Sequence, residues 1–345
     1  MHLPISAFAP RLPPRLSLGS FPSPVEEHPR LAARLGLASL VIKRDDLNGS
    51  RFGGNKLRAL EWLLPATGPA IVTMGGYGST WCAALASAGR SNGRSVYAAL
   101  FPQPWSPTVE GALSVTASEG QVSLAGSRAA LPLAVGRAWL AARREGAVSW
   151  LPAGGATPLA VLGSANAALE FVAQQAEGKI PLPDAIVVPF GSGATAAGLL
   201  IGMRLAGWEG TVCAVRVAEP WFATSGRILA LVRRTTRLLS RSGARVPVGP
   251  ARLRVVSDQL GAGYGHPTPA GIAAQVMLAG EGITVDLTYG AKAWAALAGL
   301  AASFPHLCFW HTFDTRLAPR LSREDSLLRK ARARAETLWP HQKLT

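Results

Sequence analysis

A lysine behind a glycine-rich loop is the first residue of this chain whose position suggests covalent chemistry. Residues 43–56 read KRDDLNGSRFGGNK, and Leu57, Leu60 and Leu64 lie on one face of a helix predicted over Leu57–Leu64. Lys56 therefore stands at the positive end of a helix dipole, which lowers the pKa of its amine. The neutral amine is the form that condenses with an aldehyde. An ordinary surface lysine at a helix start is the alternative interpretation.

Two other segments combine a buried strand, a glycine loop and the start of a helix. Residues 71–80 read IVTMGGYGST and end on Ser79 and Thr80, and residues 185–195 read AIVVPFGSGAT. Backbone N–H groups converge at such helix starts and bind anions. The alternative for Ser79 is a plain helix cap after a tight turn.

The second glycine loop is compatible with more than one cofactor. It lacks the GxxxxGK[ST] pattern of a nucleoside-triphosphate loop, but Gly191–Ala196 fits the GxGxxA of a dinucleotide site, with Glu219 after the next strand as a ribose ligand. A nicotinamide cofactor leaves the lysine loop and the first anion site without a role. Pyridoxal phosphate, a phosphorylated aldehyde, uses all three segments when the substrate is an amino acid.

The elements that carry these segments alternate in type along the chain. Short β-branched runs predict strands at Leu40–Lys43, Ala70–Met74, Ser95–Leu100, Val148–Leu151, Ala185–Pro189, Val212–Val217 and Leu307–Trp310. Ala- and Leu-rich stretches predict helices at Leu57–Leu64, Thr80–Ser91, Leu131–Arg144, Leu159–Glu177, Thr195–Ala206, Pro269–Glu281 and Ala291–Phe304. This alternation predicts an α/β fold with parallel sheets covered by helices. We expect a small domain at 68–163 and a large one from 1–67 and 164–345.

Composition excludes several classes of protein. The chain has 345 residues, of which 48% are hydrophobic and 16% charged, a composition that excludes a disordered chain and a coiled coil. The sequence shows no apolar run that predicts a membrane span or a secretory signal. We therefore expect a cytoplasmic protein. Cys82, Cys213 and Cys308 are widely spaced and predict free buried thiols, and the six histidines show no metal-ligand spacing. No metal site is predicted.

The net charge of +15 comes mainly from arginine. Arginines concentrate in Arg227–Arg254 and Arg316–Arg334, without the aromatic interleaving of a single-strand binder or a DNA-reading motif. We interpret most of this charge as solvated surface, so a nucleic-acid partner is not expected.

Taken together, these segments resemble the pyridoxal-phosphate enzymes of fold type II, specifically the D-cysteine desulfhydrase and 1-aminocyclopropane-1-carboxylate deaminase family. The resemblance covers nearly the whole chain. Besides the KRDDLNG and FGGNK pieces of the lysine segment, it rests on FPSPVEEHPRL at 21–31, PAGGATPLAVLG at 152–163, GAGYGHPTP at 261–269 and EGITVDLTYGAK at 281–292. It implies a tryptophan synthase β-like fold of two open parallel-sheet domains with the cofactor in the cleft between them, and we expect a homodimer.

The resemblance also implies roles for individual residues. Lys56 would form the internal aldimine, and the cofactor would be held by Asn55, Lys56, Gly191, Ser192, Gly193, Ala194, Thr195, Tyr289 and Thr312. The substrate would contact Ser79, Thr80, Trp81, Gly155 and Tyr264. Catalysis would fall to Lys56, Ser79, Tyr264 and Tyr289, with the Ser79 hydroxyl as acid, base or nucleophile.

Departures from the family pattern indicate a diverged member. Thr80 and Trp81 stand where the family reads Asn-His, and Ala59 replaces a usual lysine. Gly290 stands where a Thr or Glu faces the pyridine nitrogen, so Thr312 is expected to substitute. Absence of that Glu counts against the cyclopropane-opening deaminase.

The activity implied by the resemblance is a lyase acting on a small amino acid. Lys56 would remove the Cα proton, and elimination from a D-amino acid such as D-cysteine would give pyruvate, ammonia and sulfide. Two alternatives stay open: β-replacement, racemisation or deamination in a biosynthetic pathway, and a non-catalytic binding protein with a basic surface.

Overall fold

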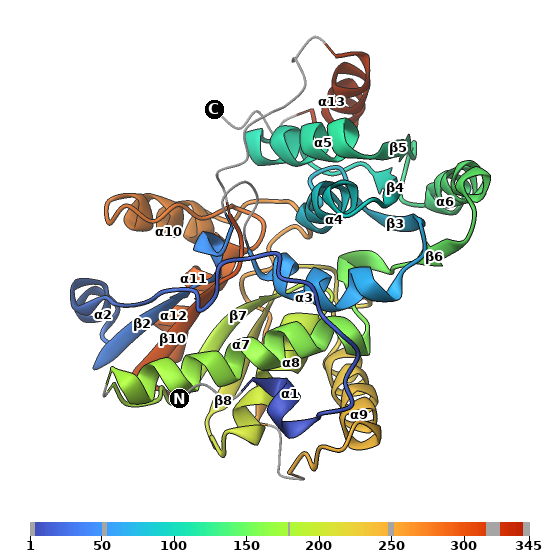
Figure 1. Cartoon of the computed structure of the whole chain (residues 1–345). Helices are drawn as coiled ribbons and strands as arrows, with labels where there is room; N and C mark the ends of the chain where they lie inside the picture. The colour runs from blue at the N-terminus through green and yellow to red at the C-terminus, as the bar shows by residue number, and fades with distance from the viewer. Residues whose placement is uncertain (1–3, 50–53, 179, 248–251, 315–324, 341–345) are drawn as a thin grey trace. The chain divides into compact units, whose positions relative to one another are not determined.

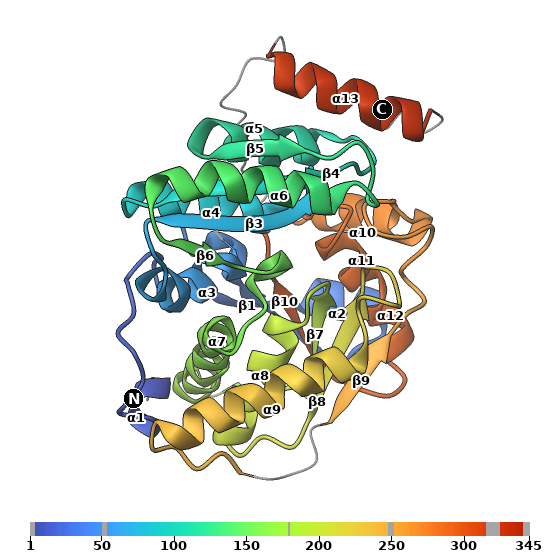
Figure 2. The ribbon, with the colours of Figure 1, turned by 90° about the vertical axis from the view of Figure 1, so that its right-hand side faces the viewer.

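The computed structural model describes residues 4–49, 54–178, 180–247, 252–314 and 325–340. The chain divides into two compact units, one of Met1–Trp62 with Ala156–Asp314 and the other of Leu63–Gly155 with Thr315–Thr345. We call them unit 1 and unit 2. The division differs from the predicted domain boundaries chiefly at the C-terminus: α13 (Ser326–Leu338) goes with unit 2, because it packs on α5 (Pro107–Glu119) and Arg334 Nε donates to the Gly126 carbonyl at 2.7 Å (Figure 2).

Unit 1 is built on a six-stranded sheet. Its strand order is β1 (Val25–Glu27), β2 (Ser39–Arg44), β10 (His306–His311), β7 (Ala185–Phe190), β8 (Thr211–Arg216) and β9 (Leu253–Val256). Only β1 pairs antiparallel; the other neighbours are parallel. The carboxyl ends of β2, β10 and β7 therefore meet at one edge of the sheet, where ligands of open α/β sheets bind.

Helices cover both faces of this sheet (Figure 1). One face carries α7 (Pro158–Glu177) and α8 (Ala194–Leu205), which pack on each other. The remaining helices of the unit are α1 (Ile5–Phe8), α2 (Pro29–Leu35), the 3-10 turn η1 (Asp45–Leu47), α3 (Asn55–Leu63), α9 (Ser225–Arg241), α10 (Pro269–Ala279), α11 (Gly290–Ala295) and α12 (Leu297–Leu300).

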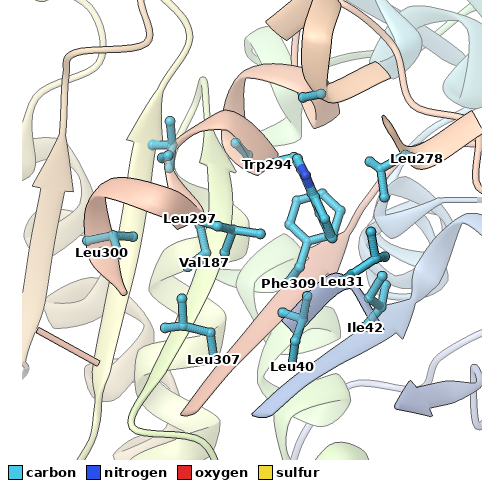
Figure 3. Close-up of a cluster of buried hydrophobic side chains, with 14 of the residues drawn as sticks. Leu31, Leu40, Ile42, Val187, Leu278, Trp294, Leu297, Leu300, Leu307 and Phe309 are labelled. Atoms are coloured by element: carbon cyan, nitrogen blue, oxygen red, sulfur yellow. The ribbon is translucent and has the colours of Figure 1, made fainter. Parts of the chain in front are cut away.

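The hydrophobic core of unit 1 shows why its strands read as continuous apolar runs. Leu40 and Ile42 of β2, Val187 of β7 and Leu307 and Phe309 of β10 pack against side chains of α2, α10, α11 and α12 (Figure 3). Strands buried on both faces have no polar alternation. The sheet is thus a rigid base for the loops at its carboxyl edge.

Unit 2 has a four-stranded parallel sheet in the order β5 (Gln121–Leu124), β4 (Ser95–Phe101), β3 (Ala70–Gly76) and β6 (Val148–Trp150). Helix α6 (Leu131–Ala142) packs on the face of the sheet formed by Val72, Tyr97 and Ala99. Helix α4 (Thr80–Ser91) contacts β3 and β4 and packs against α5. Short 3-10 turns complete the unit at Leu64–Ala66, Arg143–Glu145 and Ala153–Gly155.

All seven predicted strands are present within one or two residues of their predicted ends, and α4 has the predicted bounds. The elements that sequence reasoning missed are the edge strands β1, β5 and β9 and the helices α1, α2, α5, α9 and α13. The helix predicted over Ala291–Phe304 is wrong as one element, since it divides into α11 and α12.

The basic segment around α9 is helical and largely solvated, as its interpretation as surface requires. Ile228, Leu231 and Leu239 are buried, whereas Arg233, Arg234, Arg237 and Arg241 are exposed. Part of the second arginine cluster, at 316–324, lies outside the described residues. The three cysteines are free and buried, as predicted.

Candidate functional site

The loop before Lys56 is closed by backbone contacts to the end of β10. Gly54 has φ +98°, and a Cβ added there would lie 2.7 Å from the Thr312 carbonyl oxygen. The Asn55 N–H donates to that same oxygen at 2.9 Å, and the Gly54 N–H donates to the Asn48 side chain at 2.9 Å. Only glycine fits at position 54, because the conformation is left-handed and the neighbour is backbone. Lys56 is thereby held at the carboxyl edge of the sheet.

Burial of Lys56 increases the fraction of its amine that is neutral. Burial lowers the pKa of the Lys56 ammonium from 10.5 to about 8. A group with that pKa is neutral in roughly a tenth of molecules at pH 7, against less than about a thousandth for an exposed lysine. The first turn of α3 adds the positive end of a helix dipole, as the sequence predicted.

The glycine loop after β7 lies beside the lysine loop. The Asn55 amide donates to Thr195 Oγ1 at 2.7 Å. Gly193 has φ +91° and is the residue before α8, so it offers no capping side chain to the first N–H groups of that helix. These groups are available to an anion. The structure thus brings Asn55, Lys56 and the Gly191–Thr195 loop together within unit 1.

Two tyrosines stand at the same glycine loop. The Tyr264 and Tyr289 hydroxyls are 2.9 Å apart, with ring centroids at 5.9 Å and an interplanar angle of 78°. A Cβ on Gly191 would lie 3.5 Å from the Tyr289 ring. The tyrosine pair, which the resemblance assigned to the active site, therefore borders the loop assigned to the phosphate.

Asp286, which sequence reasoning missed, positions Tyr289. Its carboxylate accepts the backbone N–H groups of Thr288, Tyr289 and Gly290 at 3.0, 2.7 and 3.0 Å. Burial raises the pKa of Asp286, and these three donors oppose the rise. An Asp that accepts N–H groups two to four residues ahead is a helix-cap pattern, and DLTYG at 286–290 was the signal available in the sequence.

A buried ionic cluster holds the first turn of α3. Arg58 donates to Asp45 at 2.8 Å and to Glu170 of α7 at 2.9 Å, and Lys43 donates to Glu170 at 2.5 Å. Trp310 Nε1 also donates to Asp45, at 2.9 Å. Burial opposes ionisation, but Arg58 and Lys43 lower the pKa of Glu170 to about 2. Arg58 lies two residues after Lys56, so this ionic cluster fixes the helix that carries the amine.

A further contact supports the glycine loop from α9. Arg227 Nε donates to the Ser192 carbonyl at 3.1 Å, and its guanidinium lies 4.3 Å over the Phe222 ring. Sequence reasoning placed Arg227 in a solvated cluster. The structure makes it a neighbour of the Gly191–Thr195 loop instead.

The other predicted site residues belong to unit 2. Ser79 caps α4, accepting the Cys82 N–H at 3.2 Å. Trp81 is buried, donates to Thr73 Oγ1 at 2.9 Å and packs on Gly155, where an added Cβ would lie 2.4 Å from the indole. Their predicted contacts with substrate, and that of the buried Thr80, stay predictions.

The described part of the chain contains no metal-binding cluster and no membrane-spanning helix. No group of three or more His, Cys, Asp or Glu side chains in that part is arranged to hold a metal ion. Among the same residues, no helix has the length and hydrophobicity needed to cross a membrane.

Known proteins resemble this chain over most of its length. A family model described as "Pyridoxal-phosphate dependent enzyme" matches residues 16–307. A nocardicin C-9' epimerase of Nocardia uniformis subsp. tsuyamanensis is 36% identical over 88% of this chain and 94% of its own, and a D-cysteine desulfhydrase of Klebsiella pneumoniae (strain 342) is 30% identical over 82% and 87%. The crystal structure of an ACC deaminase homologue superposes with a TM-score of 0.78 at 27% identity, covering 95% of this chain and 99% of that one.

The residues of unit 1 fit pyridoxal phosphate. A lysine with a lowered pKa suits the aldehyde, and the side-chain-free helix start at Gly193 suits the phosphate. The Asn55–Thr195 bond keeps the two features adjacent. On this geometry and these matches, the chain belongs to the pyridoxal-phosphate-dependent enzymes of fold type II.

Proposed function

We propose that Lys56 is the residue that carries the cofactor and exchanges a proton with the Cα of an amino-acid substrate. Pyridoxal phosphate, when bound, supplies an electron sink that makes this Cα–H bond acidic. The Asn55–Thr195 hydrogen bond supports the assignment most directly, because it ties the lysine loop to the glycine loop at 2.7 Å. Asn55, Thr312 and Gly191–Thr195 would orient the ligand, and Tyr264 and Tyr289 would face the substrate.

The first candidate reaction is α,β-elimination from a small amino acid, like that of the desulfhydrase relative. Lys56 Nζ would take the Cα proton, and a hydroxyl of the tyrosine pair would stabilise or protonate the leaving group at Cβ. The two hydroxyls are hydrogen-bonded to each other at 2.9 Å, which keeps both phenol groups together beside the glycine loop. Pyruvate, ammonia and, from D-cysteine, sulfide are the expected products.

Epimerisation is the second candidate, and the relative with higher identity and coverage favours it. Here the proton returns to the opposite face of Cα, and nothing leaves Cβ. The altered pair Thr80–Trp81 and the glycine at 290 are consistent with a change of reaction within the family.

The cofactor assignment is tested with Lys56→Ala. Native protein treated with borohydride is expected to carry a cofactor-sized mass increment on the peptide that contains Lys56, and the variant is expected to carry none. An increment on another lysine of the native protein would contradict the assignment.

The reaction is tested in D₂O with both enantiomers of cysteine and serine and with a nocardicin. Elimination releases a 2-oxo acid, whereas epimerisation releases none, inverts the substrate and places deuterium at Cα. Cofactor absorbance that no amino compound changes would indicate the non-catalytic alternative. The predicted homodimer and cytoplasmic location stay predictions.

A further inference from the structure

Lys292, in the first turn of α11, is a fully buried ammonium group. Its Nζ donates to the carbonyls of Leu260 and Gly263 at 2.7 and 3.1 Å. Burying a cation is unfavourable unless polar partners compensate for lost water. The two carbonyls are such partners, and both belong to the segment that carries Tyr264.

The segment around Tyr264 is a run of glycine turns closed by long backbone hydrogen bonds. Gly261, Gly263 and Gly265 have φ of +62°, +124° and +83°, so the chain turns repeatedly in conformations that only glycine adopts freely. The turns close through weak bonds: the Gly263 N–H donates to Leu260 at 3.4 Å, and the His266 N–H to Gly263 at 3.3 Å. The ammonium joins the same two carbonyls from the side, and so links consecutive turns.

Two carboxylates, Asp286 in the loop before α11 and Glu219 in the loop after β8, act on the ammonium through their charges. Burial lowers the pKa of Lys292 to about 8, and the charges of Asp286 and Glu219 oppose this. Glu219 Oε1 would lie 3.5 Å from a Cβ on Gly263. Asp286 holds the Tyr289 backbone by N–H bonds, so Lys292 and Asp286 act on opposite members of the tyrosine pair.

We propose that Lys292 is a positioning residue that holds the turn at 260–264, so that the Tyr264 hydroxyl stays hydrogen-bonded to the Tyr289 hydroxyl. Its position three residues after Tyr289 lets one short helix align both rings. The effect on turnover rests on the function proposed above for the tyrosines; the effect on the turn does not.

The structural part is tested by hydrogen–deuterium exchange on the holoenzyme. Lys292→Met keeps the length of the side chain and removes its donors, and Lys292→Gln keeps an N–H donor without the charge. Amides of 260–266 are expected to exchange about tenfold faster in the Met variant, the value for loss of about 1.4 kcal/mol of local protection, and less than that in the Gln variant. Lys43→Met, at another fully buried lysine, is the control for global destabilisation. In this variant residues 260–266 should exchange no faster, relative to their neighbours, than in the native protein.

The catalytic part is tested by a double-mutant cycle with Tyr264→Phe. The Met substitution should lower kcat about tenfold in the native background and much less in the Phe background, since Lys292 then has no hydroxyl to place. Unchanged exchange at 260–266, or equal kcat losses in both backgrounds, overturns the proposal. If Lys292→Met does not fold, faster exchange in the Gln variant supports the proposal and unchanged exchange overturns it. Absence of turnover in the native protein would count against the proposed function alone.

Discussion

Gly163→Ala tests whether the close packing of α7 against α3 holds Lys56 in place, because an added Cβ at this position would meet the backbone of α3. Gly163 lies in α7 where that helix crosses α3, and a Cβ there would be 2.1 Å from the Arg58 carbonyl oxygen and 2.9 Å from the Ala59 nitrogen. Ordinary van der Waals contact begins at 3.4 Å. Because both obstacles are helix backbone, they cannot rotate away, and α3 has to move.

The expected loss of stability follows from this overlap. Overpacking against a well-packed core costs about 1–3 kcal/mol, and contact with fixed backbone argues for about 3. Alanine regains about 1 kcal/mol of helix propensity over glycine. The net loss is therefore about 2 kcal/mol, and the displaced α3 carries Lys56 with it.

The assay is urea unfolding followed by tryptophan fluorescence, together with the dissociation constant of pyridoxal phosphate. Gly299→Ala in α12 is the matched control, since nothing lies within 4 Å of its Cβ; it should gain about 0.5–1 kcal/mol. The variant Gly163→Ala should unfold at lower urea and bind the cofactor more weakly. Native-like values in both measurements would refute the packing argument.

Four other changes probe the site. Asn55→Ala removes the bond to Thr195 and should weaken cofactor binding about tenfold by spectral titration, with no change if the bond is incidental. Arg58→Met leaves two buried carboxylates with one cation and should cost about 3–5 kcal/mol in denaturant unfolding; a cost under about 1 would contradict the cluster's role. Since burial lowers the pKa of Lys56 to about 8 and the neutral amine is the reactive form, covalent attachment of cofactor to apoenzyme should accelerate as pH rises through about 8 and then level off. A rate still rising towards pH 10 would indicate an exposed lysine. Ser79→Ala should retain the cofactor and lose about 1 kcal/mol of stability, because the helix cap is removed. It should also lower kcat by about a hundredfold or more. Loss of cofactor with unchanged substrate affinity would show that Ser79 serves the cofactor and not the substrate.

Much of unit 1's site could be anticipated from short stretches of sequence. The strand, glycine loop and helix start around Gly191–Thr195 are contiguous, and the residues that form them determine turn and cap locally. The same holds for α4, whose bounds follow from Ser79 at its start and the end of its Ala-rich run. Edge strands such as β5 were not predicted, because half-exposed strands of four residues show no clear pattern of hydrophobic residues.

Arginine-rich α9 shows a different reason for a missed element. Its charge pattern drew an interpretation as solvated surface, yet a helix buries one face and exposes the other, so Ile228, Leu231 and Leu239 were the relevant signal. The number of arginines also gave no indication that two of them have structural contacts: Arg227 donates to the Ser192 carbonyl, and Arg58 is buried.

The sequence by itself determined the family and the α/β fold, and it led to the proposal that Lys56 would carry the cofactor, because each depends on residues adjacent in the chain or on motifs in a set order. Only the tertiary structure decided which charges are buried together. Arg58 and Glu170 are 112 residues apart, and Lys292 reaches a carbonyl 32 residues before it. A buried charge is stable only with its partners in place, and those partners are brought to it by the packing of distant helices and strands.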